Sequence, residues 1–289
     1  MSPQNSEAII INCSTKEQTT LALLSALRYA RLPVTVIDCE STDGSVAFLR
    51  ELQHRLSFRL AEMPLRRHGD TLDRLFRESS RDALLLIDSD AEILRDDLVP
   101  AMIEGLDGGA YGSGFLHRGE WLSSNHLVDR RVGYYAPRMW IPCVMLAVAP
   151  IRAALDAGAS FRAHVVCNEI PQLPALSRLL YLRFYVPGLR RLALERLRGL
   201  RKRHFGVQPH YVYCDTGAAL HDYLTRQRRL AFADLGADLW PLAVRHSHGV
   251  TRRRLSRRMR NAADLDRTRR EAVERIETLY GVVLPELRF

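Results

Sequence analysis

The stretch ALLLIDSD, residues 83–90, decides the fold of this 289-residue chain. Its apolar run is typical of a strand buried on both faces of a sheet. The strand ends on two carboxylates, Asp88 and Asp90, one residue apart. Ligands of doubly wound sheets bind beyond the carboxyl ends of the strands, so we expect this pair to bind a ligand. Two close carboxylates repel each other unless a cation lies between them, which predicts a divalent ion such as Mn²⁺ or Mg²⁺.

Strand and helix signals alternate along the chain before this stretch. The predicted strands cover residues 8–13, 34–38 and, more weakly, 58–61. The predicted helices cover residues 19–29, 46–56 and 69–77. Ser14 and Glu17 have the spacing of a capping box, which predicts the start of the first helix. Repeated β-α units of this kind predict an α/β fold with a mostly parallel sheet and helices on both faces.

Beyond residue 100, strand and helix signals no longer alternate regularly. Helical signals cover residues 98–106, 150–158, 175–204 and 217–230. Residues 107–114 are rich in glycine, and residues 243–248 predict a short strand. An arginine-rich helical tail closes the chain. No repeat or low-complexity linker separates these segments, so we expect one continuous unit with two lobes.

The formal net charge of +9 is unevenly distributed. Residues 1–100 carry 12 basic and 16 acidic side chains, whereas residues 178–203 and 245–260 are rich in arginine. No nucleic-acid motif accompanies the arginines, so we do not expect a nucleic-acid partner. No apolar run reaches the roughly 20 residues of a spanning helix, and the N-terminus does not resemble a signal peptide. Widely spaced cysteines without a CxxC pair predict reduced thiols in a cytoplasmic protein.

Several catalytic motifs are missing from the sequence. There is no GxxxxGK[ST] phosphate loop, and the first strand leads into Ser-Thr-Lys-Glu instead of the glycines of a dinucleotide site. No GxSxG elbow is present, which argues against a Ser-His-Asp hydrolase. The carboxylates at the strand ends therefore remain the strongest chemical signal.

Four segments of the first hundred residues match one family in order and spacing. They are NCS at 12–14, VIDCESTDGS at 36–45, HGDTLD at 68–73 and LIDSDAEI at 86–93. The second is similar to the family's VDNGSTDGS and the fourth to its FLDSDTEI. With them the chain resembles a GT-A-fold glycosyltransferase of the family 2 type, a group of nucleotide-sugar enzymes. Cys39 and Glu40 depart from the family pattern, which leaves open which residue contacts the nucleotide.

The resemblance implies a metal site and a nucleotide pocket. Asp88 and Asp90 form the DxD motif that holds a divalent metal on the nucleotide diphosphate. The segment HSHGV, residues 246–250, resembles an element that supplies a third ligand, and either His246 or His248 fits, with His246 preferred on spacing. The residues implied for the nucleotide pocket are Ser14, Asp38, Glu40, Arg67, His68, Asp88 and Arg252.

An inverting transferase also needs a carboxylate that accepts the proton of the acceptor hydroxyl. Asp215, in a Cys-Asp-Thr-Gly segment that resembles one in relatives, is the expected base. A plain helix N-cap has the same appearance in sequence, so both interpretations stay open. Asp129 and Glu169 are alternative bases.

Aromatic and basic segments complete the predicted site. The aromatic residues that either stack on a sugar or acceptor or pack in the core are Trp121, Tyr135 and Trp140. Residues 178–203 alternate leucines with arginines, which is typical of a helix on an anionic membrane, of an acceptor site, or of a solvated helix packed on the other lobe. The arginines of residues 252–258 are placed to offset charge on a diphosphate leaving group.

The sequence therefore predicts a metal-dependent, inverting glycosyltransferase. Its donor would be a nucleotide-diphosphate sugar, with UDP favoured and GDP or dTDP open, and its acceptor a natural product, saccharide, lipid-linked or peptide nucleophile. We expect a nucleotide-sugar-binding half at 1–110, an acceptor-binding half at 111–250 and a helical extension at 251–289. The alternatives are a sugar-phosphate nucleotidyltransferase and a non-catalytic module that docks a membrane or an acidic partner.

Overall fold

The computed structural model describes residues 5–117, 133–167, 211–247, 262–284 and 287. The predicted elements and site residues outside these ranges are residues 175–204, residues 252–258, Trp121, Asp129, Glu169, His248 and Arg252.

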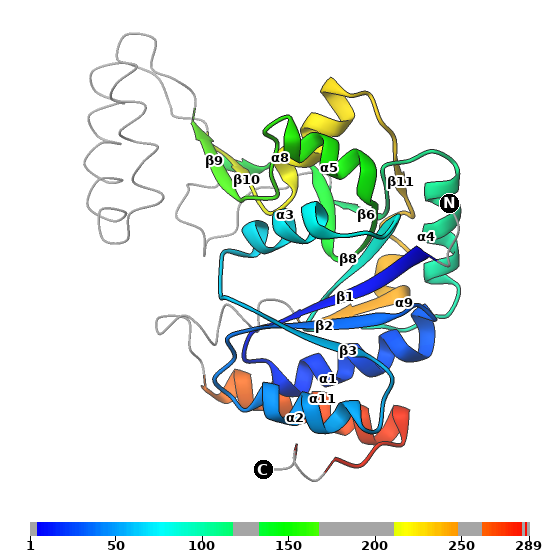
Figure 1. The fold of residues 1–289 in the computed structure, drawn as a ribbon, viewed down its shortest axis with the longest axis vertical. Coiled ribbons are helices and arrows are strands. Elements are labelled where there is room, and N and C mark those ends of the chain that lie inside the picture. The colour runs from blue at the N-terminus through cyan, green and yellow to red at the C-terminus, as the bar shows by residue number, and fades with distance from the viewer. Residues whose placement is uncertain (1–4, 118–132, 168–210, 248–261, 285–286, 288–289) are drawn as a thin grey trace, which may run out of the picture.

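The chain forms an α/β structure (Figure 1). The described strands are β1 (Ser6–Asn12), β2 (Val34–Cys39), β3 (Arg59–Met63), β4 (Ala83–Asp88), β5 (Ala91–Ile93), β6 (Gly112–His117), β7 (Gly133–Tyr135), β8 (Arg138–Ala147), β9 (His164–Cys167), β10 (Tyr211–Cys214), β11 (Phe232–Asp234) and β12 (Val244–His246). The described helices are α1 (Lys16–Ser25), α2 (Ser45–Gln53), α3 (His68–Glu78), α4 (Leu98–Asp107), α5 (Val148–Asp156), α8 (Ala218–Asp222), α9 (Trp240–Ala243) and α11 (Ala262–Tyr280), with π-helical turns η2 (Ala26–Ala30) and η3 (Tyr223–Gln227).

Seven of these strands form the central sheet, in the order β11-β6-β8-β4-β1-β2-β3. The pairs β3-β2, β2-β1 and β1-β4 are parallel, and β8 alone among the described strands of this sheet runs against its neighbours. Helices α1, α2 and α11 cover one face, and α3, α5 and α8 lie over the other (Figure 1). The predicted mostly parallel sheet flanked by helices is confirmed.

The core lies on both faces of this sheet because side chains alternate along each strand. In β1, Ala8 and Ile10 pack among the residues beneath α1 and α2, while Ile9 packs with Leu72 and Phe76 of α3. A strand with both faces covered is apolar throughout, which explains the continuous runs in the sequence.

Local signals placed the first elements correctly but not the start of α1. Thr15, not Ser14, is the N-cap residue, and no side-chain capping bond is made. Ser14 adopts a left-handed backbone conformation with φ of 54°, and its hydroxyl accepts the backbone N–H of Thr42 at 3.0 Å. Glu17 pairs with Arg269 of α11 at 2.8 Å. The predicted capping box is therefore wrong, because both of its side chains serve tertiary contacts.

The C-terminal helix α11 packs along α1 and belongs to the same core (Figure 1). Its Arg275 binds the buried carboxylate of Glu92 through two hydrogen bonds, of 2.7 and 3.0 Å. The Tyr280 hydroxyl donates to the same carboxylate at 3.0 Å. The helix is thus tied to β5, immediately after the two aspartates of the DxD motif.

Replacing Arg275 with methionine is expected to lower the free energy of unfolding by about 3 kcal/mol, because Glu92 keeps its charge in a buried position with one donor left. Urea denaturation measures this loss. The double variant Arg275→Met with Glu92→Gln should recover most of it, since the buried charge is then gone. A single-variant loss below about 0.5 kcal/mol, typical of a surface substitution, would show that the pair contributes little.

A second buried polar pair lies on the opposite face of the sheet. The Tyr111 hydroxyl and His221 Nδ1 are hydrogen-bonded, and both side chains are buried. Burial lowers the pKa of His221 from 6.5 to about 4. The folded protein therefore keeps this imidazole neutral across a range in which an unfolded chain protonates it.

Stability is expected to fall as the pH is lowered from 6.5 to 4. In that window the unfolded chain binds a proton that the folded protein does not, so the unfolded state gains up to about 3 kcal/mol. Urea denaturation at several pH values measures the slope. His221→Asn keeps an acceptor for Tyr111 without titrating, and its stability should depend less on pH; an unchanged slope would rule out His221 as the source.

Among the described residues, no helix combines the length and hydropathy needed to cross a membrane. The central sheet also crosses the predicted division at residue 110, since β6, β8 and β11 come from the second part of the chain. The division into three parts stays a prediction.

Candidate functional site

The polar residues at the carboxyl ends of β1, β2 and β4 lie side by side. The strand register pairs Asn12 with Asp38 and Ile11 with Asp88. Parallel strands end at a common edge, so residues distant in sequence meet there.

Asn12 joins the loops that follow β1 and β2. Its side chain is fully buried, and its Nδ2 donates to Asp38 at 2.6 Å and to the Ser41 hydroxyl at 3.1 Å. Its Oδ1 accepts the backbone N–H of Thr15 at 3.1 Å. The prediction overlooked this role, although an asparagine that ends a run of isoleucines is a signal for it.

The predicted nucleotide residues Ser14, Asp38 and Glu40 lie on these two loops. Asp38 is buried, and its second oxygen accepts the Ser41 backbone N–H at 2.9 Å. The Ser14 backbone N–H donates to the Ser41 hydroxyl at 2.7 Å. Glu40 is exposed, with φ of 51°. The structure thus shows Asp38 holding the loop, and contact of these residues with a nucleotide stays a prediction.

Asp88, Asp90 and His246 form a cluster at the same edge of the sheet. One ligand atom of each lies within 4.8 Å of the others. His246 Nε2 is 3.1 Å from Asp90 Oδ1 and 3.8 Å from Asp88 Oδ2. The antiparallel pair of β5 and β12 places His246 opposite Ala91. The structure therefore brings together three of the four residues predicted as metal ligands, and the fourth, His248, lies outside the described residues.

Burial and charge set the protonation of this cluster. Burial raises the pKa of Asp88, the charges of Asp90 and Asp215 raise it further, and those of His68 and His246 oppose them. Burial lowers the pKa of His246, but its hydrogen bond with Asp90 and the charges of both aspartates outweigh burial, so the pKa is raised. The cluster thus holds two negative charges close together, which favours a positive charge between them.

The donor set fits a divalent metal. Two carboxylate oxygens and an imidazole nitrogen on rigid strand ends suit Mn²⁺ or Mg²⁺, with further positions left for phosphate oxygens. Asp90 and His246 expose 7% and 9% of their side chains, against 28% for Asp88. The cluster therefore opens to solvent on the side of Asp88.

His68 and Asp215 lie near the cluster, since the charge of each acts on Asp88. Arg67 and His68 are exposed at the start of α3. Asp215 follows β10 and forms an ion pair with Arg138 of β8 at 3.0 Å. The N-cap residue of α8 is Gly217, so the alternative of Asp215 as a plain helix cap is wrong. Arg138 was not among the predicted residues.

Aromatic rings line one side of His246. The rings of Trp140 and Trp240 are stacked, with centroids 4.1 Å apart, and Trp140 lies edge-on to His246 at 6.4 Å. Phe115 packs against the edge of Trp240. Trp140 thus has a packing role, and stacking on a sugar stays a prediction for it.

Residues 8–140 match the model of glycosyl transferase family 2. No curated protein matches the sequence. The matched residues contain most of β1, all of β2 to β7, and both aspartates of the cluster. His246 and Asp215 lie beyond them.

Three solved structures show distant similarity. S. aureus TarS 1-349 in complex with UDP-GlcNAc is 14% identical, with a TM-score of 0.38; the alignment covers 54% of this chain and 48% of that one, about half its length. The mannosyltransferase PcManGT from Pyrobaculum calidifontis, in complex with GDP-Man and Mn²⁺, is 14% identical, with a TM-score of 0.41 and coverage of 97% and 76%. The 4-diphosphocytidyl-2C-methyl-D-erythritol synthase from Anaerococcus prevotii is 11% identical, with a TM-score of 0.39 and coverage of 54% and 77%.

The family match covers the segments on which the resemblance rests, NCS, VIDCESTDGS, HGDTLD and LIDSDAEI. The resemblance predicted from the sequence is confirmed over residues 8–140, which are similar to glycosyl transferase family 2.

Proposed function

We propose that the protein is a metal-dependent glycosyltransferase that moves a sugar, with inversion, from a nucleotide-diphosphate sugar to an acceptor nucleophile. The observation that carries this proposal is the cluster of Asp88, Asp90 and His246 at the carboxyl edge of a family 2 domain. The donor is a UDP, GDP or dTDP sugar. The acceptor is a hydroxyl or other nucleophile on a natural product, saccharide, lipid-linked molecule or peptide.

The three cluster residues would hold Mn²⁺ or Mg²⁺. A bound divalent ion supplies Lewis-acid stabilisation of the charge that develops on a diphosphate leaving group. The loops held by Asn12 and Asp38 would form the floor of the nucleotide pocket, with Ser14 and Glu40 beside it. Arg67, His68 and Arg252 would add positive charge toward the diphosphate.

Asp215 would accept the proton of the acceptor hydroxyl as it attacks the anomeric carbon. Its carboxylate is close enough to influence Asp88 and is oriented by the ion pair with Arg138. A base held on the acceptor side of the metal site suits attack from the face opposite the diphosphate, which inverts the anomeric configuration.

The basic segment of residues 178–203 would meet an anionic membrane surface or the acceptor.

Four cysteines, Cys13, Cys39, Cys143 and Cys214, are free and buried. Burial raises the pKa of each thiol, most strongly for Cys39 and Cys143, to about 12. Protonated, unpaired thiols fit the reducing cytoplasm, where we place the enzyme.

Product analysis tests the function directly. The protein is incubated with Mn²⁺ and a panel of UDP, GDP and dTDP sugars, and release of the nucleoside diphosphate is measured with and without EDTA. We expect release from at least one donor, and only with metal. A parallel incubation with nucleoside triphosphates and sugar 1-phosphates measures pyrophosphate; its release in place of the diphosphate would identify a nucleotidyltransferase. No release in either series would favour the binding module.

A further inference from the structure

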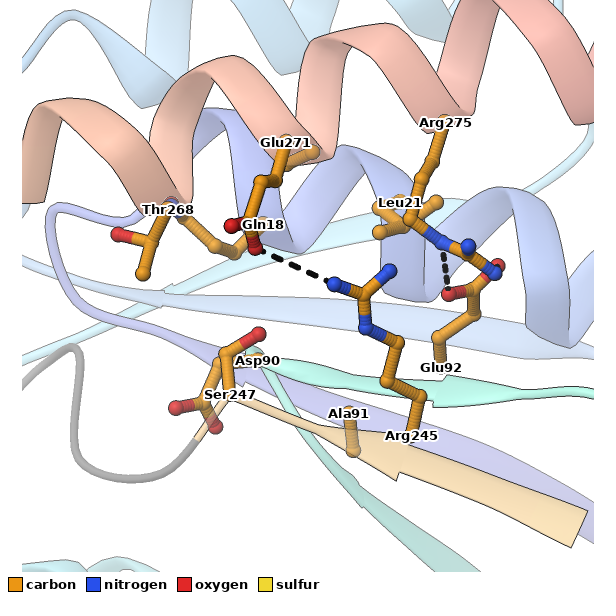
Figure 2. Close-up of a pocket in the computed structure, with 11 residues that line it drawn as sticks. Gln18, Leu21, Asp90, Ala91, Glu92, Arg245, Ser247, Thr268, Glu271 and Arg275 are labelled. Atoms are coloured by element: carbon orange, nitrogen blue, oxygen red, sulfur yellow. Dashed lines mark hydrogen bonds and ion pairs between the residues drawn. The ribbon is translucent and has the colours of Figure 1, made fainter. Parts of the chain in front are cut away.

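A small polar cavity lies behind Asp90, between α1, the β5-β12 pair and α11 (Figure 2). The volume in which the centre of a water molecule fits is about 10 Å³. That is room for one water, which needs a cavity of roughly this size and two to four polar partners. Polar or charged residues make up eight of the eleven that line it, so polar partners for a water are at hand.

Gln18 of α1 lines this cavity and is 3% exposed. Both polar atoms of its side chain, Nε2 and Oε1, are buried and have no hydrogen-bond partner among the described residues. An unsatisfied buried polar group costs about 1–3 kcal/mol, and buried amides in folded proteins almost always have a protein or water partner. The cavity beside Gln18 therefore calls for an occupant that both donates and accepts hydrogen bonds.

The other walls of the cavity come from the cluster of Asp88, Asp90 and His246, through Asp90, and from α11. Asp90 and Ser247 line the cavity at the cluster, and the Ser247 backbone N–H donates to the Asp90 carbonyl at 2.9 Å. Thr268 lines it from α11 (Figure 2). Two ion pairs close its sides: Arg245 with Glu271 at 3.2 Å, and Arg275 with Glu92.

We propose that one ordered water occupies this cavity, bound by the Gln18 amide, and links α1 to the strand end that carries Asp90. Gln18 is then a positioning residue: it does not touch the metal or the substrate, but it holds Asp90 and the neighbouring Ser247 in place for metal binding. This role rests on the proposed function, whereas the water itself does not. Groups that hold metal ligands in place typically contribute 10- to 100-fold to metal affinity.

A high-resolution crystal structure of the unaltered protein tests the water. We expect density for one water within hydrogen-bond distance of the Gln18 side chain. A dry cavity, or a rotated Gln18 that pairs directly with protein, would overturn the proposal. The crystal structure requires neither metal nor activity, so it tests whether the water is present even if the proposed function is wrong.

Calorimetric titration with Mn²⁺ alone tests the positioning role. Gln18→Leu removes both polar atoms at similar volume, and we expect the Kd for Mn²⁺ to rise about 10-fold or more while the fold is retained. Gln18→Glu keeps an acceptor for the water and should lose less affinity than Gln18→Leu. The matched control is Gln227→Leu, at an exposed position of η3, which should leave the Kd unchanged.

An unchanged Kd in folded Gln18→Leu, with the water seen in the unaltered protein, would overturn the positioning role. Failure of the proposed metal site gives a different result, because the unaltered protein itself would then bind no Mn²⁺. In that case the proposed positioning role of Gln18 would also be wrong.

Discussion

Replacing either Asp88 or Asp90 with asparagine is expected to lower the rate of sugar transfer by about 10³-fold, because a metal ligand contributes several kcal/mol to stabilising the leaving-group charge. An amide keeps the shape of the side chain but brings no negative charge. The rate of nucleoside diphosphate release at saturating Mn²⁺ measures the effect, and the Kd for Mn²⁺ should rise in parallel.

The same substitutions should leave the metal-free fold intact. Burial and the charge of Asp90 both raise the pKa of Asp88, so the ionised carboxylate is held at a cost to stability that Asp88→Asn removes. We therefore expect an unchanged or higher Tm for Asp88→Asn without metal. The matched control is Asp96→Asn, which removes an exposed carboxylate that forms an ion pair with Arg31 at 3.9 Å. Transfer rates within tenfold of the unaltered protein in both cluster variants would contradict a metal role.

Asp215→Asn is expected to reduce kcat by roughly 10²- to 10⁴-fold, the usual effect of removing a general base. The KM for the donor and the Kd for Mn²⁺ should change little, because the residue acts on the acceptor and not on the diphosphate. Steady-state kinetics with both substrates varied separates these effects.

Asp222→Asn provides the matched control for that substitution. Asp222 is an exposed carboxylate of α8, paired with Arg226 at 3.0 Å, and its loss should not affect kcat. If Asp215→Asn instead raised the KM for the donor with kcat unchanged, Asp215 would be a binding residue, and Asp129 and Glu169 would become the leading candidates for the base.

Local sequence patterns predicted the first half of the fold well. The runs at residues 8–13, 34–38 and 83–87 became β1, β2 and β4 because a strand covered on both faces must be apolar at every position. Helix α2 begins at Ser45, one residue before the helix predicted at residues 46–56. Each of these signals lies within one element and needs no tertiary context.

Strand β12 lies within the predicted strand at residues 243–248. The other strands of the second half were not predicted, because their signals depend on partners far away. Strand β8 carries Trp140 and Pro142 in a mixed stretch, and it forms a strand by inserting between β4 and β6. Strand β5 has three residues, too few for periodicity, yet it supports both Asp90 and His246. Arg275 of α11 meets Glu92 at a separation of 183 residues, which no local pattern reveals.

The candidate site likewise contains residues that local sequence patterns predicted and residues that they did not. Asp88 and Asp90 were recognisable because a motif and a buried strand coincide there. His246 was named with His248 as an alternative, and only the pairing of β12 with β5 brings it to Asp90. Asn12, Arg138 and Gln18 were overlooked, because their roles consist of hydrogen bonds, ion pairs or cavities that form after folding.

Calorimetric titration of UDP, GDP and dTDP into the protein, with Mn²⁺ and then with EDTA, tests whether the cluster binds a nucleotide through a metal. We expect at least one nucleotide to bind with Mn²⁺, and this binding to be lost with EDTA and in Asp88→Asn. Equal binding with and without metal, or no binding of any nucleotide in either condition, would contradict this expectation.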